Sequence, residues 1–531
     1  MLFALVSGGL TACGGGSSSS SGSIGDGGGS GGTTVTTNIS GFVSYDSVPH
    51  TAVTHGLSYA DTVEKPVRGA TVQLLNGSGG VLDESFTDNN GNYLLEAPAN
   101  TQVRVRVRAE SISTGTASWD VSVRDNTSGK ALYVLQGDLI NSGTSDSVRD
   151  LHAASGWSLS ANDYTGERAA APFAILDTVY SSLQSFVAVD ANINFPALQV
   201  LWSEDNIPQD GELTAGEIGT SFFTSDGNAI YLLGAKDSDT DEFDSHVIAH
   251  EWGHYFEANL SRSDSIGGSH TLTAALDMRL AFGEGWGNAL SAMVLEDPLY
   301  VDSGGPAQAL GFAIDVEDNV YSPEGWFNEG SVQSILYDIY DGSSDGSDNL
   351  NMGLDEIYAV LTSSSYINSE LFTSIHLFID TFKTANPSVA SSIDALAAAQ
   401  SITVDDAMGS TETNANGVSE LLPIYTELNQ GGTVQVCMVN DFGNDNKLGT
   451  HRYVLLPNVA GGSHTLTVAR ASGALATDPD FYLYRRGVYV TKSEDSVSDI
   501  ESWSNTLTSG DYIMDVYDFE NNDVCYNVSW N

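Results

Sequence analysis

Residues 246–257 read HVIAHEWGHYFE, and within them His250, Glu251 and His254 form the pattern H-E-x-x-H. On an α-helix, residues four apart lie on one face one turn apart, so both imidazoles can reach a single metal ion. Glu251 follows the first imidazole directly, where it can accept a proton from a water bound to that metal. The stretch therefore predicts a helix that carries two metal ligands and a general base.

A catalytic zinc ion needs a third protein ligand and an open position for water. The segment AFGEGWGNALSAM, residues 281–293, supplies Glu284 on a second expected helix. Asn288 lies four residues later on the same face, where its side-chain oxygen can orient a zinc-bound imidazole. The glycines around Glu284 allow the two helices to approach closely. The sequence thus predicts zinc held by His250, His254 and Glu284, with Asn288 behind one histidine.

H-E-x-x-H followed by a G-E-G-W segment resembles the gluzincin metallopeptidases, both thermolysin-like and fungalysin-like. The resemblance implies zinc on His250, His254 and Glu284, with Glu251 as the general base of peptide hydrolysis. The segment GWFNEGSVQSILYDIYD, residues 325–341, also resembles the helix that closes the active site in thermolysin-like enzymes. An α+β thermolysin-like catalytic domain is therefore expected.

The chain departs from the thermolysin-like pattern in two places. Asn288 stands where those enzymes carry an Asp that orients the first histidine. No residue is an evident match for the histidine that stabilises the oxyanion in thermolysin. Five side chains remain candidates for that donor: His270, His376, Tyr255, Tyr321 and Tyr337.

Two more features near the motif have open interpretations. His246 lies one turn before His250, either behind the metal ligands or as an ordinary, partly exposed histidine. The run GNAIYLLGA, residues 227–235, is expected to be a strand. It is either an edge on which an extended substrate pairs through its backbone or an interior strand of a sheet.

The sequence on both sides of this central part reads as β-structure. Residues 38–140 contain short runs with period-two alternation, such as QVRVRVRAE at 102–110. Within them, PVRGATVQLL and FTDNNGNYLLEAP resemble the transthyretin-like, carboxypeptidase-regulatory β-sandwich. Residues 415–531 resemble the pre-peptidase C-terminal β-sandwich of secreted bacterial peptidases. The expected fold is multidomain, with the α+β catalytic domain at 141–410 flanked by two all-β sandwich domains.

The N-terminus, MLFALVSGGLTAC, is a short apolar run that ends in a Cys. It resembles the lipobox of bacterial lipoproteins, which implies a signal peptide at 1–12 and lipidation of Cys13. The alternative is a plain signal peptide with an incidental Cys, and no Lys or Arg precedes the apolar run. Gly14 in place of Asp favours the outer membrane in this analogy, with exposure at the cell surface or secretion. Residues 13–37 are expected to form a Gly/Ser tether.

The composition is strongly acidic, with 19 Lys and Arg against 69 Asp and Glu and a formal net charge of −50. Such a surface repels phosphate backbones and anionic lipids, so no nucleic-acid partner is expected, and a lipid anchor is the only expected contact with a membrane. The acidic run DSDTDEFD at 237–244 is a candidate calcium site, although its spacing is not that of an EF-hand. In an exported protein, Cys437 and Cys525 are expected to form a disulfide. A monomer is expected.

Together these patterns predict an exported zinc metalloendopeptidase that acts on a protein or peptide substrate. Two alternatives stay open. The first is a catalytically inactive binding or adhesive lipoprotein on a peptidase scaffold, which the presence of Glu251 beside a full ligand set opposes. The second is a zinc hydrolase of cell-wall amides or of esters, which would use the same zinc chemistry in a different cleft.

Overall fold

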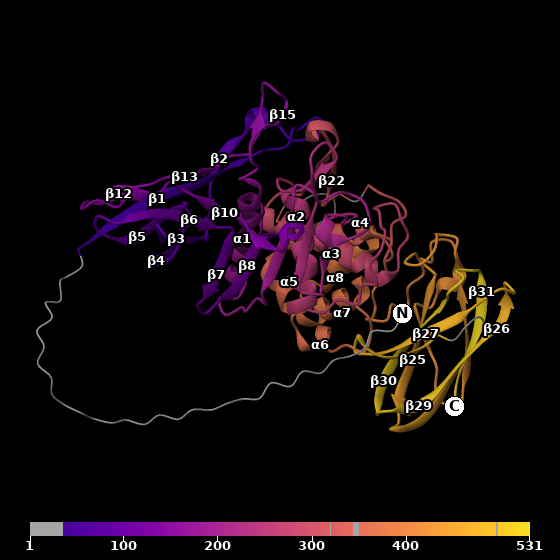
Figure 1. Cartoon of the computed structure of the whole chain (residues 1–531). Coiled ribbons are helices and arrows are strands. Elements are labelled where there is room, and N and C mark those ends of the chain that lie inside the picture. Colours follow the sequence, from indigo (N-terminus) through magenta and orange to yellow (C-terminus); the bar gives the residue numbers. More distant parts are fainter. Residues whose placement is uncertain (1–34, 319, 343–349, 495–497) are drawn as a thin grey trace, which may run out of the picture.

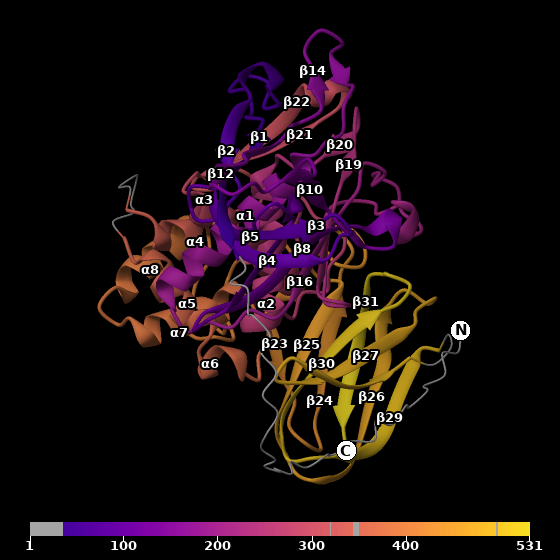
Figure 2. The ribbon, with the colours of Figure 1, turned by 60° about the vertical axis from the view of Figure 1, so that its left-hand side comes forward.

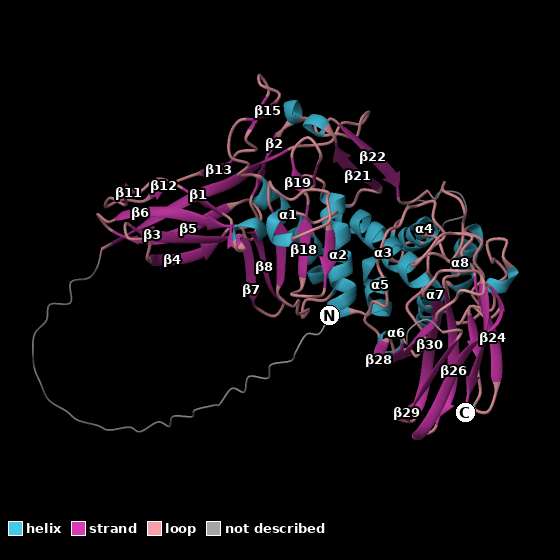
Figure 3. Ribbon diagram, turned by 45° about the vertical axis from the view of Figure 1, so that its right-hand side comes forward, coloured by secondary structure: helices cyan, strands magenta, loops and turns pink. Residues whose placement is uncertain are grey.

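The computed structural model describes residues 35–531 except 319, 343–349 and 495–497 (Figure 1). The expected signal peptide, Cys13 and nearly all of the Gly/Ser tether lie outside the described residues. The chain folds into a multidomain, β-rich structure. Figure 3 shows the helices gathered in the middle of the molecule, with strands on both sides of them. In the described part of the chain, no helix has the length and apolar character needed to cross a membrane.

Two five-stranded sheets form the N-terminal part. The first is built around β1, with its strands at β1 (Thr36–Ser47), β2 (Val63–Pro66), β5 (Asn92–Pro98), β12 (Ser147–Val148) and β13 (Leu151–Ala153). The second contains β3 (Thr71–Asn76), β4 (Val81–Phe86), β6 (Gln102–Arg108), β10 (Val134–Gln136) and β11 (Ile140–Asn141). Along β6, Val103, Val105 and Val107 are buried, and the three arginines that alternate with them are half-buried, as the period-two pattern predicts.

A six-stranded sheet supports the central helices. Its path runs β17–β18–β16–β8–β7, with β9 beside β8. The strands are β7 (Glu110–Thr114), β8 (Ser118–Asp125), β9 (Ala131–Leu132), β16 (Leu198–Trp202), β17 (Phe222–Thr224) and β18 (Ala229–Leu232). Because β18 lies between β16 and β17, the run at 227–235 is an interior strand, and the edge of the sheet at that end is β17.

The expected boundary between residues 140 and 141 does not coincide with the division between the sheets. Strands β7 and β8 precede it, yet β8 pairs in parallel with β16 of the central sheet. Strands β12 and β13 follow it, yet both pair with β1. Alternation along a strand reveals which face is buried but not which distant strand is its partner, so the sequence placed this boundary wrongly.

Eight α-helices pack on and beside the central sheet. They are α1 (Ala171–Val189), α2 (Ser245–Leu260), α3 (Met278–Leu295), α4 (Glu329–Tyr340), α5 (Gly353–Leu361), α6 (Ser364–Ile367), α7 (Ile375–Ala385) and α8 (Ala390–Ala399), counted over the described residues. Helix α1 has Pro172 in its first turn, where the missing N–H costs no helical hydrogen bond. Helix α7 begins after Ser374, whose hydroxyl caps it by accepting from the Leu377 N–H.

Short strands complete the central part. A small hairpin joins β14 (Trp157–Ser158) and β15 (Asp163–Tyr164). A four-stranded sheet, in the order β19–β20–β21–β22, contains β19 (Gly234–Ala235), β20 (Asp239–Thr240), β21 (Leu299–Gly304) and β22 (Leu310–Asp315). This sheet lies next to α2, because the Asp244 carboxylate at the start of that helix accepts from the backbone N–H of Ser303 on β21.

The C-terminal part consists of two sheets with their own hydrophobic core, which we call the C-terminal sandwich (residues 425–530; Figure 2). One sheet runs β23 (Tyr425–Glu427), β25 (His451–Val459), β30 (Gly510–Asp518), β27 (Pro479–Arg485), β28 (Val488–Ser493). The other runs β24 (Thr433–Met438), β31 (Val524–Trp530), β26 (Gly462–Gly473), β29 (Ile500–Leu507). Cys437 and Cys525 are opposite each other on β24 and β31 and form the expected disulfide.

A buried ion-pair network joins the C-terminal sandwich to the first turn of α3. Arg279 is 1% exposed and donates through Nε and Nη2 to both oxygens of Asp277, which also caps α3, and through Nη1 to Asp515 of β30. His451 donates from the other side to Asp515, 2.8 Å away. Burial would raise the pKa of Asp515, but Arg279 and His451 outweigh it and lower that pKa to about 2.

Arg279→Ala is expected to destabilise the protein by about 3–5 kcal/mol, because it leaves the carboxylates of Asp277 and Asp515 buried without their cation. Arg486→Ala is the matched control, since its ion pair with Glu370 also links the sandwich to the central part but is half exposed. That control should cost less than about 1 kcal/mol. Denaturant titrations of both variants measure the difference, and equal losses would contradict the assigned role of Arg279.

Candidate metal centre

Helices α2 and α3 bring the predicted ligands together. His250 and Glu284 are buried and His254 is half-buried. His250 Nε2 lies 3.0 Å from His254 Nε2 and 3.2 Å from Glu284 Oε2, and His254 Nε2 lies 3.5 Å from the same oxygen. Three ligand atoms at about 2.0–2.2 Å from a tetrahedral zinc ion stand about 3.4 Å apart. The triangle therefore has the dimensions and the N,N,O donor set that zinc takes in hydrolytic sites.

The charges in this group also suit a cation. Burial would raise the pKa of Glu284, but His254, His250 and His270 outweigh it and hold that pKa well below its usual range. The carboxylate is thus ionised at neutral pH. Two imidazole nitrogens that face each other across 3.0 Å need either a shared proton or a common cation between them.

Asn288 occupies the predicted place behind His250. Its Oδ1 lies 2.8 Å from His250 Nδ1, while its Nδ2 donates to Gln333 Oε1 on α4 over 2.9 Å. Because the amide nitrogen already donates to Gln333, the oxygen faces the ring, so Nδ1–H is the donor and Nε2 keeps its lone pair for a metal. Gln333 was not singled out in the sequence, although it lies on the helix expected to close the site.

His254 has a second buried carboxylate behind it. Glu257 Oε2 lies 3.8 Å from His254 Nδ1, one helical turn away on α2, and Glu257 is 1% exposed. Burial raises the pKa of Glu257, against the pull of His254. The i, i+3 spacing was visible in the sequence, but nothing there showed that Glu257 points inward.

Glycines make the close contact between α2 and α3 possible. A Cβ at Gly287 would fall 2.8 Å from the ring of His250, and a Cβ at Gly253 would fall 3.2 Å from Gly287 Cα. A Cβ at Gly285 would fall 2.5 Å from Val332 of α4. At Gly283 the nearest atom is 3.4 Å away, an ordinary contact. Gly287 thus allows the approach of α2 to α3 that the sequence suggests, Gly285 allows α4 to pack on α3, and Gly283 contributes to neither contact.

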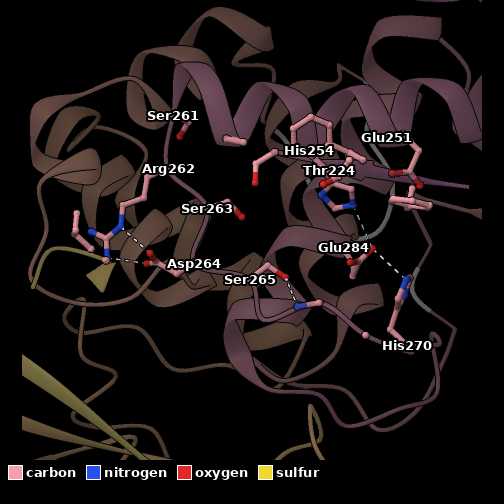
Figure 4. Close-up of a pocket in the computed structure, with 18 of the residues that line it drawn as sticks. Thr224, Glu251, His254, Ser261, Arg262, Ser263, Asp264, Ser265, His270 and Glu284 are labelled. Atoms are coloured by element: carbon pink, nitrogen blue, oxygen red, sulfur yellow. Dashed lines mark hydrogen bonds and ion pairs between the residues drawn. The ribbon is translucent and has the colours of Figure 1, made fainter. Parts of the chain in front are cut away.

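Only one of the five candidate oxyanion donors lies at the metal centre. His270 Nε2 is 3.2 Å from Glu284 Oε2, and its Nδ1 is 2.7 Å from Glu329 Oε2 (Figure 4). Burial lowers the pKa of His270, but the two carboxylates outweigh it and raise it to about 9. The remaining four, Tyr255, Tyr321, Tyr337 and His376, do not line the cavity described next.

His246 does not lie behind the metal ligands, and it is buried, whereas the alternative left open by the sequence was an ordinary, partly exposed histidine. Its Nε2 lies 3.1 Å from the carbonyl oxygen of Asp297, and its ring lies against Tyr300 of β21. Burial lowers its pKa, which favours a neutral ring. It therefore packs against β21 and is not among the residues that could hold the metal.

The metal centre opens into a large cleft, with a volume of about 1810 Å³. Glu251 is 8% exposed and lines it together with His250, His254, Glu284 and His270. Figure 4 shows Glu284 between His254 and His270, with Glu251 and Thr224 close by. Further walls come from edge strand β17, from residues 261–270, and from the β27–β28 turn of the C-terminal sandwich.

A group of three carboxylates lies outside this cleft. The carboxylates of Asp239, Asp241 and Asp302 lie within 4.8 Å of one another. Burial, followed by repulsion from neighbouring carboxylates, raises the pKa of Asp302 to about 8 and that of Asp239 to about 6. The expected calcium segment, 237–244, thus supplies two of the three carboxylates, and calcium binding there stays a prediction.

Residues 188–398 match the Mycolysin C-terminal domain. This mycolysin-like segment contains α2, α3 and every residue of the candidate metal centre. No curated protein matches the chain. Among solved structures, the pre-peptidase C-terminal domain of a Bacillus anthracis collagenase is 12% identical, with a TM-score of 0.17, over 20% of this chain and 94% of that one.

A second solved structure is the lysozyme inhibitor PliG of Aeromonas hydrophila. It is 16% identical with a TM-score of 0.14, over 20% of this chain and 97% of that one. These scores are too low to support an argument about the fold. The resemblance of residues 415–531 to pre-peptidase C-terminal sandwiches therefore stays a prediction from the sequence.

Gly287→Ala is expected to weaken zinc binding at least tenfold, because its methyl group would displace the His250 ring from the ligand triangle. Gly283→Ala is the control on the same helix, with the same gain in helix propensity of about 1 kcal/mol and an ordinary contact at its Cβ. Competition with a zinc-binding dye measures both affinities. Equal affinities for the two variants would contradict the steric role of Gly287.

Calcium at saturating zinc is expected to raise the melting temperature by a few degrees, since a bound cation relieves the repulsion among Asp239, Asp241 and Asp302. Asp302→Asn should remove this rise, whereas Asp226→Asn, at an exposed position, should keep it. Calorimetry with and without calcium is the measurement. An unchanged melting temperature in the parent protein would exclude a calcium site at these residues.

Proposed function

We propose that this chain is an exported zinc metalloendopeptidase, with zinc on His250, His254 and Glu284 and Glu251 as general base. The observation that carries the proposal is the ligand triangle with the Glu251 carboxylate beside it at the edge of an open cleft. The mycolysin-like segment adds support, because Mycolysin C-terminal domains occur in secreted peptidases. Anchoring through Cys13 and a monomeric state belong to the proposal on sequence grounds alone.

Zinc, when bound, supplies a Lewis acid that polarises a water molecule and a substrate carbonyl. Glu251 directly follows His250 on α2 and lines the cleft, so its carboxylate takes the proton from the attacking water. The same carboxylate then passes that proton to the leaving amine. Asn288 and Gln333 keep His250 in one tautomer throughout, which leaves the ligand set unchanged.

His270 is the donor that we assign to the developing oxyanion. It is held by Glu329, lies beside the metal triangle and carries a proton at neutral pH. Its Nε2 faces Glu284 Oε2 at 3.2 Å, so this N–H would turn to the oxyanion when a metal takes up that oxygen, and a charged donor stabilises negative charge more strongly than a neutral one. Of the five candidates that the sequence left open, only this residue combines a proton with a position at the site.

The substrate backbone is expected to pair with β17. This strand has β18 on one side, and the described residues place no strand on its other side. Phe222, Phe223 and Thr224 also line the cleft that contains the metal centre. An extended peptide added to this edge would run past Glu251 with its backbone hydrogen bonds satisfied.

The deciding experiment compares the purified protein with Glu251→Gln on a fluorogenic protein substrate. The amide cannot take a proton, so the rate should fall by a factor of about 10²–10⁴ while zinc content stays near one per chain. Glu212→Gln, an exposed carboxylate, is the control and should retain activity. A chelator should abolish activity and added zinc should restore it.

Each other outcome selects an alternative. Bound zinc without cleavage of proteins would favour the hydrolase of cell-wall amides, which purified peptidoglycan tests directly. Bound zinc without cleavage of either substrate would favour an inactive scaffold. A chain that binds no zinc would contradict the metal site itself.

A further inference from the structure

The C-terminal sandwich forms one wall of the cleft that contains the metal centre. Seven of its residues line the same cavity as His250 and Glu251. They come from the β27–β28 turn with the strand residues beside it, and from the β29–β30 connection with the start of β30: Arg485, Arg486, Gly487, Val488, Val490, Thr508 and Tyr512. The mycolysin-like segment ends at 398, so these residues lie outside it.

This wall is fixed firmly to the central part. Gly487, with φ of +69°, packs so tightly on the Arg262–Asp264 ion pair that a Cβ there would overlap both side chains. Arg486 donates through Nε to Glu370 Oε1 over 2.8 Å. With the Arg279 network at the other end of the interface, these contacts hold the β27–β28 turn at one place in the cleft.

Three arginines line the cleft, and they differ in their partners. Arg262 is paired with Asp264 and also donates to the carbonyl oxygens of Ser369 and Leu371. Arg486 is paired with Glu370. Arg485 donates from Nη1 to Thr508 Oγ1 over 3.0 Å and lies 5.7 Å from the centre of the Tyr512 ring. Across the described residues, no carboxylate comes within ion-pair distance of Arg485.

Among the three arginines of the cleft, Arg485 alone lacks a carboxylate partner among the described residues, although acids outnumber Lys and Arg by 69 to 19 in the chain. Arg485 is half-buried and held in place by the Thr508 hydroxyl, the Tyr512 ring and close packing on Gly510. A guanidinium has five N–H donors in a planar fork that matches a carboxylate, and Thr508 takes one of them. The others are available to a ligand in the cleft.

We propose that Arg485 is a specificity-determining residue that binds a carboxylate of the polypeptide substrate, an Asp or Glu side chain at a fixed distance from the cleaved bond. The neighbouring Val488 and Val490 are 67% and 40% exposed, so they offer apolar contacts to the residues beside that acid. The inference rests on the proposed peptidase function and adds the substrate class: segments with an acidic residue at one defined position.

The test uses the full protein and two series of peptides, one C-terminally amidated and one with free C-termini. Within each series the peptides come in pairs that are identical except for Glu or Gln at one position. Successive pairs place that position at a different residue before or after the cleaved bond. At one position, Glu should raise kcat/KM about tenfold over Gln, as one charge-assisted hydrogen bond provides. Arg485→Gln should bring this ratio close to one, and Arg485→Lys should keep part of it.

Arg470→Gln is the matched control. It removes the same charge from the same sandwich, but Arg470 is paired with Asp499 and does not line the cleft. It should therefore keep the tenfold ratio, which separates a contact with Arg485 from a general change in net charge. Melting curves confirm that each variant folds.

A binding measurement separates this proposal from the peptidase assignment. In the Glu251→Gln background, fluorescence anisotropy should show about tenfold weaker binding of the tightest-binding Glu peptide of the series after Arg485→Gln. This result would support Arg485 even if the parent protein cleaved nothing. The proposal is overturned if the parent shows no Glu preference at any position, or if Arg485→Gln keeps the parental ratio. A preference seen only with free C-termini would assign the bound group to a terminal carboxylate instead.

Discussion

The close packing of α2 against α3 is the constraint on which the metal centre depends. The two imidazoles are fixed relative to each other by the helical repeat of α2, but the third donor, Glu284, belongs to another helix. The triangle of 3.0–3.5 Å forms only because Gly287 has no side chain where the His250 ring lies and Gly253 meets its backbone. Any larger side chain at Gly287 would separate the carboxylate from the imidazoles, so the glycine is as necessary as the ligands.

In this strongly acidic chain, structural sites and candidate functional sites differ in whether their buried charges have partners within the chain. Asp277 and Asp515 are neutralised by Arg279, and Glu242 is neutralised by Arg168. Such pairs satisfy each other and offer nothing to a ligand. The metal triangle, the Asp239–Asp241–Asp302 group and Arg485 differ because their charges lack a full set of partners within the chain. Each of these places is therefore where a metal, a cation or a substrate carboxylate would complete the structure.

Local patterns in the sequence were sufficient for the residues that share a helix. The i, i+4 spacing placed His250 with His254 and Glu284 with Asn288, and the two cysteines paired as expected. Features that depend on contacts between distant segments of the chain could not be predicted from the sequence in the same way. Strand β8 looked like part of the N-terminal sandwich but pairs with β16, and the sheet edge that lines the cleft is β17, because alternation does not encode a partner. Gln333 and Glu257 were missed because their burial depends on tertiary packing.

The residues proposed for catalysis and the residues proposed for substrate recognition line the same cleft but come from different parts of the chain. All residues that would act on the reacting bond come from α2, α3 and the loop that carries His270, within the mycolysin-like segment. The wall with Arg485 comes from a sandwich that folds around its own core and is joined to α3 through Arg279. A rigid joint of this kind matters because a specificity contact works only at a fixed distance from the reacting atoms. If Arg485 binds substrate as proposed, sequence changes in the β27–β28 turn would alter which segments enter the cleft without disturbing the candidate metal ligands, whereas changes at the Arg279 network would disturb recognition and stability together.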